Sequence, residues 1–300
     1  MDVDKLLELG LLAKGILPED LEEIEEALEE TKPPIQEVYF RCSAQLFKDF
    51  LRLLSVMNEE VVFKATPNEL EINQMDAAHI SLIHTKIDPY YCFMEYSCGG
   101  QTTLTLPIKR ILSILPSRLK DHEIAFKYPL DGDINTSQLT LITPTGQTYH
   151  YRLTMPETTD YRDFKMAVEW HGLAKINLRF LYELLKQSKN LGEENIWRIP
   201  LEIELTPQYI RFVTKGDVGE IEQTLTREDP NLYAISASCE GLKSKVDVKR
   251  LLPFVQNALR LTDGAEIHLS IPHPRPKPIK IILPTALGNI EYYLAPIYEG

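Results

Sequence analysis

The chain has 300 residues, a formal net charge of −12 and four cysteines. This length allows two domains of ordinary size, each with its own core. No apolar run approaches the ~18 residues that cross a bilayer, and the first residues lack the charged-then-apolar layout of a signal peptide. We therefore expect an intracellular protein, cytoplasmic or in the nucleoid, with no membrane partner. The cysteines show no CxxC spacing, which favours buried thiols over a redox or metal site.

Acidic side chains are concentrated at the beginning of the chain. Residues 1–34 contain eleven acids and three lysines, which leaves 33 acids and 29 bases for the rest. We predict that residues 1–37 form an acidic N-terminal extension with short helices over 6–12 and 21–28. It is either a solvated appendage, a docking element for a partner helix, or an arm that keeps DNA off one surface. The total charge does not exclude DNA binding by the remainder, because the distribution of charge over faces decides it.

From residue 38 onward, hydrophobic periodicity predicts a strand, a helix, several strands, a second helix and further strands. The helices are predicted over 44–57 and 106–119. The strands are predicted over 38–42, 61–65, 70–73, 80–87, 91–97, 123–128, 138–143 and 147–153.

The second half follows the same plan. Helices are predicted over 177–190 and 246–261, and Pro253 inside the latter is expected to kink it or delay its start. Strands are predicted over 165–170, 201–205, 209–214, 221–225, 266–271, 279–283 and 290–294. Residues 272–278 are predicted to form a proline-rich edge loop.

Three sequence blocks recur in the same order at an offset of 140 residues. They are Thr66-Pro67 with Thr206-Pro207, Ile108-Lys109-Arg110 with Val248-Lys249-Arg250, and Pro144-Thr145 with Pro284-Thr285. One offset shared by three blocks indicates two copies of one domain. The predicted fold class is therefore α+β, with tandem domains over 38–153 and 166–300, each a duplicated strand-helix-strands unit, joined by a connector over 154–165.

The connector is polar but contains two aromatic residues, Tyr161 and Phe164. The rings either pin the connector to the sheet or form the rim of a hydrophobic pocket on the outer surface. The residues alone favour neither interpretation.

Basic residues recur on the predicted helices. Lys109 and Lys120 are eleven residues apart, about three helical turns, and recur as Lys249 and Arg260. A solvated face explains one such pair, but repetition between the copies favours a surface that contacts phosphates without sequence preference. The candidate DNA-binding residues are Lys48, Arg52, Lys109, Arg110, Lys120, Arg179, Lys186, Lys189, Lys249, Arg250 and Arg260.

Enzyme functions find little support. Asp76, His79 and His84 could be combined into a metal site, but strand alternation directs Asp76 and His79 to opposite faces, and the spacing is not that of common ligand sets. No G-x-S-x-G, P-loop or G-x-G-x-x-G motif occurs. We expect no catalytic residue, metal or cofactor.

Two motifs resemble the proliferating cell nuclear antigen family of DNA polymerase sliding clamps, archaeal type. They are Met75-Asp76-Ala77-Ala78-His79-Ile80-Ser81-Leu82 and Tyr292-Tyr293-Leu294-Ala295-Pro296, and the similarity covers about Val38 to Glu299. The resemblance implies a ring of three two-domain subunits, with sheets outside and helices lining a hole that encircles duplex DNA. It implies a processivity factor in DNA replication and repair, without catalysis.

The resemblance also implies partners and their sites. Polymerase, clamp loader, flap endonuclease and DNA ligase would insert short motifs into a pocket lined by Met75, His79, Ile80, Tyr161, Phe164, Pro278, Ala295 and Pro296. The connector is predicted to be shorter than usual and to carry aromatic rather than aliphatic residues, so client preference is expected to differ. Subunits would pair residues 148–153 with 210–215 of a neighbour, with interface residues Tyr149, Tyr151, Leu153, Ile210 and Phe212.

Two functions from different classes remain open. The favoured one is a DNA-encircling clamp, a homotrimer or a mixed trimer with paralogues. The alternative is a scaffold of the same fold that does not encircle DNA by itself and binds through its acidic extension. The basic helices favour the first.

Overall fold

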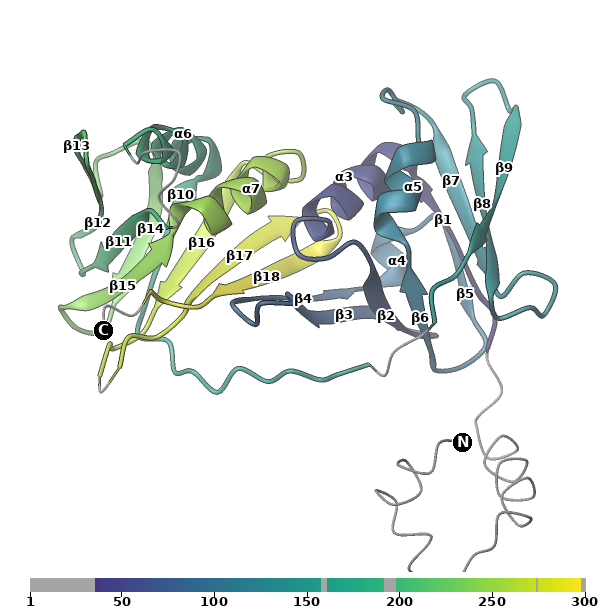
Figure 1. Ribbon diagram of the computed structural model, residues 1–300, viewed down its shortest axis with the longest axis horizontal. Coiled ribbons are helices and arrows are strands. Elements are labelled where there is room, and N and C mark those ends of the chain that lie inside the picture. The colour runs from purple at the N-terminus through teal and green to yellow at the C-terminus, as the bar shows by residue number, and fades with distance from the viewer. Residues whose placement is uncertain (1–35, 158–160, 192–197, 274, 298–300) are drawn as a thin grey trace, which may run out of the picture. The chain divides into compact units, whose positions relative to one another are not determined.

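The computed structural model describes residues 36–157, 161–191, 198–273 and 275–297 (Figure 1). The chain divides into a unit of residues 1–35 and a unit of residues 36–300. The predicted helices over 6–12 and 21–28 lie outside the described residues. Within the described ranges, no helix is both long and apolar enough to cross a membrane.

The first sheet is antiparallel and belongs to the first half of the chain. Its strand order is β5-β1-β7-β8-β9. The strands are β1 (Val38–Ser43), β5 (Glu95–Cys98), β7 (Glu123–Tyr128), β8 (Thr136–Ile142) and β9 (Thr148–Thr154).

The second sheet is shared by both halves, in the order β14-β10-β16-β17-β18-β4-β3-β2-β6. Its first-half strands are β2 (Val61–Thr66), β3 (Glu69–Met75), β4 (Ser81–Ile87) and β6 (Thr102–Leu106). Its second-half strands are β10 (Gly172–Asn177), β14 (Leu232–Ala237), β16 (Gly264–Leu269), β17 (Ile279–Thr285) and β18 (Gly288–Leu294). Antiparallel pairing of β18 with β4 joins the two halves.

The third sheet completes the second half, in the order β13-β12-β11-β15. Its strands are β11 (Pro200–Leu205), β12 (Tyr209–Gly216), β13 (Gly219–Thr226) and β15 (Leu242–Asp247). The order β5-β1-β7-β8-β9 therefore corresponds to β14-β10-β16-β17-β18, and β6-β2-β3-β4 corresponds to β15-β11-β12-β13. The two halves of the chain therefore share one strand order, as the repeat in the sequence predicts.

Four helices pack on one side of the strands (Figure 1). They are α3 (Ala44–Leu54), α5 (Ile108–Ile114), α6 (Leu178–Lys189) and α7 (Val248–Ala258), while α4 (Pro89–Cys92) is a single turn. Polar side chains cap three of them, since Ser43, Asn177 and Asp247 accept hydrogen bonds from the first turns of α3, α6 and α7. Helix α3 contacts both α5 and α7, and α6 contacts α7.

The apolar faces of the helices and strands form a continuous core. Phe50, Phe126, Phe212 and Phe254 are each at most 2% exposed. Burying an aromatic side chain of this size stabilises a fold by about 1.5–3 kcal/mol relative to leaving it exposed. The predicted α+β fold class, with each half duplicated, is confirmed.

Several predicted elements are wrong. The helix predicted over 106–119 ends at Ile114 because Leu115, in extended conformation, precedes Pro116. The strand predicted over 91–97 is divided between α4 and β5, since Asp88 caps a helical turn that begins at Pro89. Helix α7 begins two residues later than predicted and contains Pro253.

The strand predicted over 165–170 does not form. These residues continue the connector, which links the end of β9 to the start of β10 and covers Met155 to His171. Strands β6, β14 and β15 were not predicted.

Candidate nucleic-acid and client-binding surfaces

Helix α6 presents the clearest basic surface. Arg179, Lys186 and Lys189 are exposed, and the two lysines lie in the last turn, where the helix dipole favours cations. None of the three forms an ion pair with an acid in the part of the chain that the structure describes. They are therefore available to phosphate oxygens.

Lys48 of α3 does not fit the predicted DNA surface. It is only 3% exposed, and its Nζ donates to the carbonyl oxygens of Leu115 and Pro116. Burial, followed by the charge of Arg52, lowers the pKa of Lys48. Its ammonium group supplies donors to the carbonyls that follow α5, so the assignment of Lys48 to DNA is wrong.

Two other first-half cations form ion pairs within the chain. Arg52 Nη1 lies 3.2 Å from Asp49 Oδ1, and Lys109 Nζ lies 2.5 Å from Glu59 Oε1. Lys120 is exposed but lies in a turn after α5. The inference that Lys109 and Lys120 share a helix face is therefore wrong.

Two predicted DNA-binding arginines of the second half also differ from the prediction. Arg260 is exposed but follows the end of α7, so it does not share a helix face with Lys249. Arg250, at the start of α7, places Nη1 3.5 Å from Asp76 Oδ2 in the turn between β3 and β4. This ion pair links the two halves of the chain.

The turn between β3 and β4 is ordered by the same carboxylate. Asp76 Oδ1 accepts hydrogen bonds from the backbone N–H groups of Ile80 at 2.7 Å and Ser81 at 2.9 Å. His79 adopts a φ of 55° and is exposed. The argument from strand alternation at Asp76 and His79 fails, because these residues form a turn.

The connector is fastened to the sheet by one side chain. Asn73 Nδ2 donates to the carbonyl oxygen of Phe164 at 2.9 Å and to Asp163 Oδ1 at 3.2 Å. Tyr161 packs under Lys64, whose Nζ lies 5.5 Å from the ring centroid. Burial raises the pKa of Tyr161, and the nearby charge of Glu71 adds to this. The Tyr161 ring and the backbone carbonyl of Phe164 therefore hold the connector to the sheet.

A groove of about 950 Å³ lies between the connector and the sheet. Three predicted client-binding residues, Met75, His79 and Phe164, line it. It is more acidic than expected, because it is also lined by Glu59, Glu60, Asp76 and Glu157, and its described lining holds one arginine, Arg162, and no lysine.

The other predicted client-binding residues lie beside this groove rather than in it. The N–H of Ala295 donates to the carbonyl oxygen of Ile80 at 2.8 Å, which places the C-terminal segment next to the β3–β4 turn. Pro278 directly precedes β17, whose first residue pairs with Leu294. Pro296 and Tyr161 are half-buried and do not line the groove.

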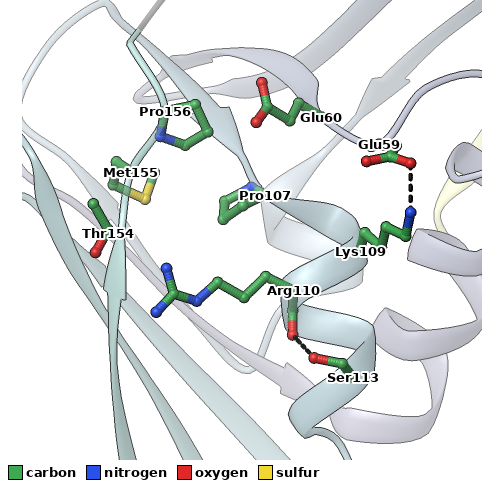
Figure 2. Close-up of a pocket in the computed structure, with 9 residues that line it drawn as sticks. All are labelled: Glu59, Glu60, Pro107, Lys109, Arg110, Ser113, Thr154, Met155 and Pro156. Atoms are coloured by element: carbon green, nitrogen blue, oxygen red, sulfur yellow. Dashed lines mark hydrogen bonds and ion pairs between the residues drawn. The ribbon is translucent and has the colours of Figure 1, made fainter.

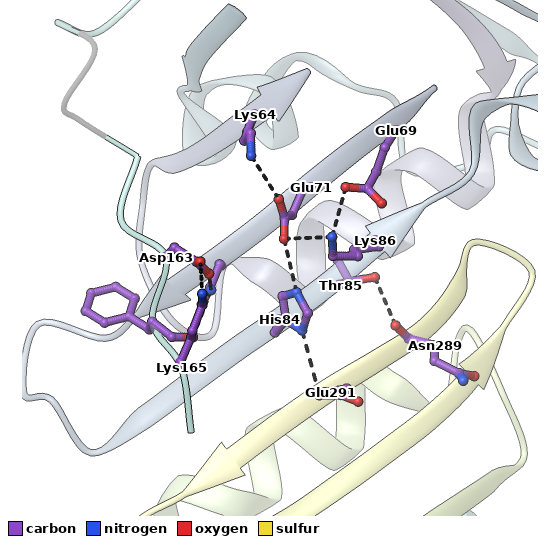
Figure 3. Close-up of polar contacts among 12 residues, drawn as sticks. Lys64, Glu69, Glu71, His84, Thr85, Lys86, Asp163, Lys165, Asn289 and Glu291 are labelled. Atoms are coloured by element: carbon purple, nitrogen blue, oxygen red, sulfur yellow. Dashed lines mark hydrogen bonds and ion pairs between the residues drawn. The ribbon is translucent and has the colours of Figure 1, made fainter. Parts of the chain in front are cut away.

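A charged network, not predicted from the sequence, spans the junction of the two halves (Figure 3). His84 of β4 lies 3.3 Å from Glu71 of β3 and 3.7 Å from Glu291 of β18. Lys64 and Lys86 flank Glu71 at 3.6 Å and 3.3 Å. The only sequence signal was the alternation of charged residues on adjacent strands, which does not identify pairing partners.

The network shifts the pKa values of its members. The hydrogen bond to Glu291, followed by that to Glu71, raises the pKa of His84 against the effect of burial. The hydrogen bond from His84 lowers the pKa of Glu291 to about 2, with further contributions from Tyr293 and Lys280. The imidazole of His84 thus connects β3, β4 and β18, and the two carboxylates beside it favour its protonated form.

We predict a pH-dependent contribution of His84 to stability. Because its folded-state pKa is raised, this contribution is full below the unfolded pKa of about 6.5 and is lost as pH rises through the folded value. His84→Gln is expected to lower the free energy of unfolding by about 1 kcal/mol at pH 6 and by less at pH 9. Denaturant titrations at both pH values test this, and an equal loss at both would contradict it.

The two strands predicted to form subunit edges lie at different places in their sheets. Among the described strands, β9 pairs only with β8, so it lies at the edge of its sheet, and Tyr149 is 50% exposed there while Leu153 is buried. Tyr151 is half-buried on the same strand. Strand β12, however, pairs with both β11 and β13, and its Ile210 and Phe212 are fully buried. The edge at residues 210–215 is therefore wrong, because β13 is the outer strand of this sheet.

A second cavity, of about 510 Å³, lies where β9 meets the connector (Figure 2). Pro107, Met155 and Pro156 form its apolar walls. Arg110 extends from α5 toward Thr154 across this cavity rather than along the helix, as Figure 2 shows. No acid in the described residues pairs with the Arg110 guanidinium.

The same architecture occurs in solved structures of sliding clamps. The proliferating cell nuclear antigen of Thermococcus kodakaraensis matches with a TM-score of 0.75 and 18% identity, covering 87% of this chain and 100% of that one. The chain has the sliding-clamp fold. The Entamoeba histolytica protein of the same name matches with a TM-score of 0.73, 18% identity and 87% coverage of this chain.

Curated relatives agree with this fold. The DNA polymerase sliding clamp of Cenarchaeum symbiosum is 24% identical over 252 residues, covering 83% of this chain and 93% of the relative. That of Nitrosopumilus maritimus is 24% identical over 254 residues, covering 84% and 95%. No family model matches the sequence. The resemblance to sliding clamps stated from the two motifs is confirmed.

Proposed function

We propose that this chain is a DNA sliding clamp, a processivity factor that encircles duplex DNA and tethers polymerase and other replication and repair enzymes. It works by binding and not by catalysis, inside the cell where DNA is copied. A closed ring raises the effective concentration of a bound enzyme at its template without strengthening any single contact.

One observation carries this proposal above the others. The internal repeat makes β18 the counterpart of β9 and β4 the counterpart of β13. Inside the chain β18 and β4 are paired, whereas β9 and β13 each lack a second partner among the strands that the structure describes. If β9 of one subunit pairs with β13 of the next, as β18 pairs with β4 inside the chain, the subunits assemble head to tail. Such a heterologous assembly forms a ring when the rotation from one subunit to the next closes. The family resemblance favours three subunits.

The helices supply the contact surface for DNA. Arg179, Lys186 and Lys189 lack acidic partners among the described residues and can approach phosphates without reading bases. Lys249 and Arg260 extend the basic surface at α7 and the turn that follows it. Clients, among them polymerase, clamp loader, flap endonuclease and DNA ligase, would dock at the groove beside Met75, His79 and Phe164.

A second candidate function rests on the first-half helices. Lys48 is buried, and Arg52 and Lys109 are paired with acids, so this half offers fewer cations to DNA than expected. A scaffold of the same fold, or one subunit of a mixed ring, would not need these cations for DNA binding. The free cations of α6 favour the clamp.

The test is polymerase extension on a primed circular template. Adding the purified chain, with a clamp loader and ATP, is expected to lengthen the products made in a single binding event by about tenfold or more. Products that stay the same length with and without the chain would contradict the clamp and favour the scaffold.

A further inference from the structure

We propose that Tyr90 and Tyr91 form a second docking surface, which binds an arginine side chain of a partner protein together with an apolar side chain next to it. This surface goes beyond the proposed clamp function, because it is separate from the basic helices and from the client groove. Exposure, ring geometry, rigid support and local charge all point to this kind of partner.

Three large apolar side chains are exposed close together after β4. Tyr90 is 85% exposed, Tyr91 80% and Met94 59%. The other exposed large apolar side chains in the described ranges occur singly along the chain, which is normal for a protein surface. A cluster between residues 90 and 94 is different, because grouped apolar side chains on a surface mark interaction sites.

The two tyrosine rings stand at right angles to each other. Their centroids are 5.1 Å apart, and their planes make an angle of 89°. Perpendicular rings leave a corner bounded by one face of each ring, and a cation in this corner contacts both faces. Because the face of an aromatic ring is negative, it attracts the charged groups of Arg and Lys. The flat guanidinium of Arg also stacks on such a face.

Backbone hydrogen bonds fix the segment that carries the rings. Pro89 occupies the first turn of α4, and Asp88 Oδ1 accepts from the N–H of Tyr90 at 2.9 Å. At the other end, the N–H of Met94 donates to the carbonyl oxygen of Arg41 in β1 at 2.8 Å. The segment is therefore tied to the fold on both sides of the tyrosines.

The side chains that follow the tyrosines point the other way and anchor the segment. Phe93 stacks on Phe40 at 5.1 Å and on Tyr96 at 5.8 Å between ring centroids. The Sγ of Cys92 donates to the carbonyl oxygen of Ala286 at 3.4 Å. A surface that is rigid before binding loses little conformational entropy when a partner arrives.

An acid beside the rings adds negative charge. Asp88 directly precedes α4 and is exposed. No cation in the part of the chain that the structure describes forms an ion pair with its carboxylate. An arginine stacked at the tyrosines would therefore find an acid that has no cation of its own, and a charge-assisted hydrogen bond to it is stronger than a neutral one.

Nearby cations are already paired, which argues against nucleic acid as the occupant. Lys86 of β4 lies 3.0 Å from Glu69. Arg41 of β1 lies 2.8 Å from Glu95. Single-stranded nucleic acid stacks on aromatic rings where free cations also hold its backbone. Here its phosphates would face Asp88 instead, so a basic protein segment fits this surface better.

Met94 indicates the second feature of the partner. Its flexible thioether lies three residues after Tyr91 and is exposed. Methionine adapts its shape to different apolar side chains at binding surfaces. The partner segment is therefore expected to present an apolar residue such as leucine beside its arginine.

The surface is at the opposite end of β4 from the client groove. Strand β4 begins at Ser81, just after the turn that places His79 in the groove, and ends at Ile87 just before Asp88. Seven residues of strand span about 20 Å. A partner at the tyrosines would therefore not compete with a client in the groove.

The experiment uses NMR on the full chain, labelled at the methyl groups of its six methionines. Met94→Leu identifies the Met94 signal, and Met75 reports on the client groove. The probe is the peptide Gly-Arg-Leu-Arg-Leu-Gly, and a matched peptide carries Glu in place of both Arg. The Arg peptide is expected to shift the Met94 signal with a Kd of about 1 mM or below. The Glu peptide is expected to leave it unchanged.

Variants show whether the rings and the acid cause the shift. Tyr90→Ala with Tyr91→Ala is expected to weaken peptide binding at Met94 about tenfold, because both cation–π contacts are lost. Asp88→Asn keeps an oxygen that caps α4 but removes the charge, and a loss of about threefold is expected. Tyr233→Ala removes an exposed tyrosine of the edge strand β14 and is the matched control, with binding expected within about twofold of the unmodified chain.

Each outcome decides the inference. A Met94 shift that weakens in the double tyrosine variant but not in Tyr233→Ala supports it, and thermal unfolding checks that the variants are folded. An equal shift in the double variant, or no shift at millimolar peptide, overturns it. A shift of Met75 without one of Met94 also overturns it, since the cation would then bind in the acidic groove. Polymerase extension tests the clamp function independently of all these results.

Discussion

Charge reversal on α6 is expected to abolish stable retention of the protein on DNA. The variant carries Arg179→Glu, Lys186→Glu and Lys189→Glu, which changes three exposed side chains without acidic partners in the described structure. Cations that neutralise phosphates release counterions, and this release supplies most of non-specific affinity. Reversing three charges in every subunit is expected to lower retention on nicked circular DNA by about 100-fold at physiological salt.

A matched variant separates this effect from net charge. Lys165→Glu, Lys175→Glu and Lys243→Glu produce the same change in charge at positions on the connector and strands, where side chains are 83%, 47% and 45% exposed. Retention is expected to change less than about twofold, since these positions lie outside the helices. Equal losses in the two variants would show that α6 is not the DNA surface.

The second large effect is expected at the connector. Phe164→Ala removes an aromatic side chain from the groove while the backbone carbonyl at this position still accepts from Asn73. Truncating a buried anchor at an interface centre typically costs 2 kcal/mol or more. We expect affinity for a client peptide with one aliphatic and two aromatic anchors to fall about 30-fold or more, measured by calorimetry.

Tyr161→Phe provides the control for this prediction. It removes only the hydroxyl, and the ring stays under Lys64. Peptide affinity is expected to stay within about twofold of the unmodified chain. A peptide that binds Phe164→Ala as tightly as the unmodified protein would place the client site elsewhere on the surface.

The parts of the fold that the sequence predicts well are those whose signals are local. Helices α3 and α6 combine an apolar stripe with a capping side chain, Ser43 or Asn177, and their starts are found within a residue. The Thr-Pro turns and the fixed offset between copies are likewise visible without tertiary contacts. These signals sufficed for the fold class and for the resemblance.

What the sequence did not predict depends on contacts distant along the chain. Lys48 is buried because carbonyls that follow another helix accept from its Nζ. Residues 165–170 have the composition of a strand but pair with none of the described strands. Ile210 and Phe212 were expected at an edge because of the family resemblance, yet β13 pairs with their strand, and only the order of strands in the sheet shows this.

The residues of the candidate site also divide into those found from local sequence signals and those that depend on distant contacts. Met75 and His79 came from a motif and Phe164 from the family resemblance of the connector, and all three line one groove. Arg110 came from helix periodicity and points instead into the cavity where β9 meets the connector. The His84 network could not be foreseen, because it needs the register of β4 against both β3 and β18.

The most direct test of the proposed clamp is retention of the unmodified protein on a nicked circular duplex before and after the circle is cut once. A ring around DNA is held by topology, so we expect it to stay on the circle through a wash at 0.5 M salt and to leave once a free end exists. Release from the uncut circle at the same rate as from the linear duplex would contradict encirclement.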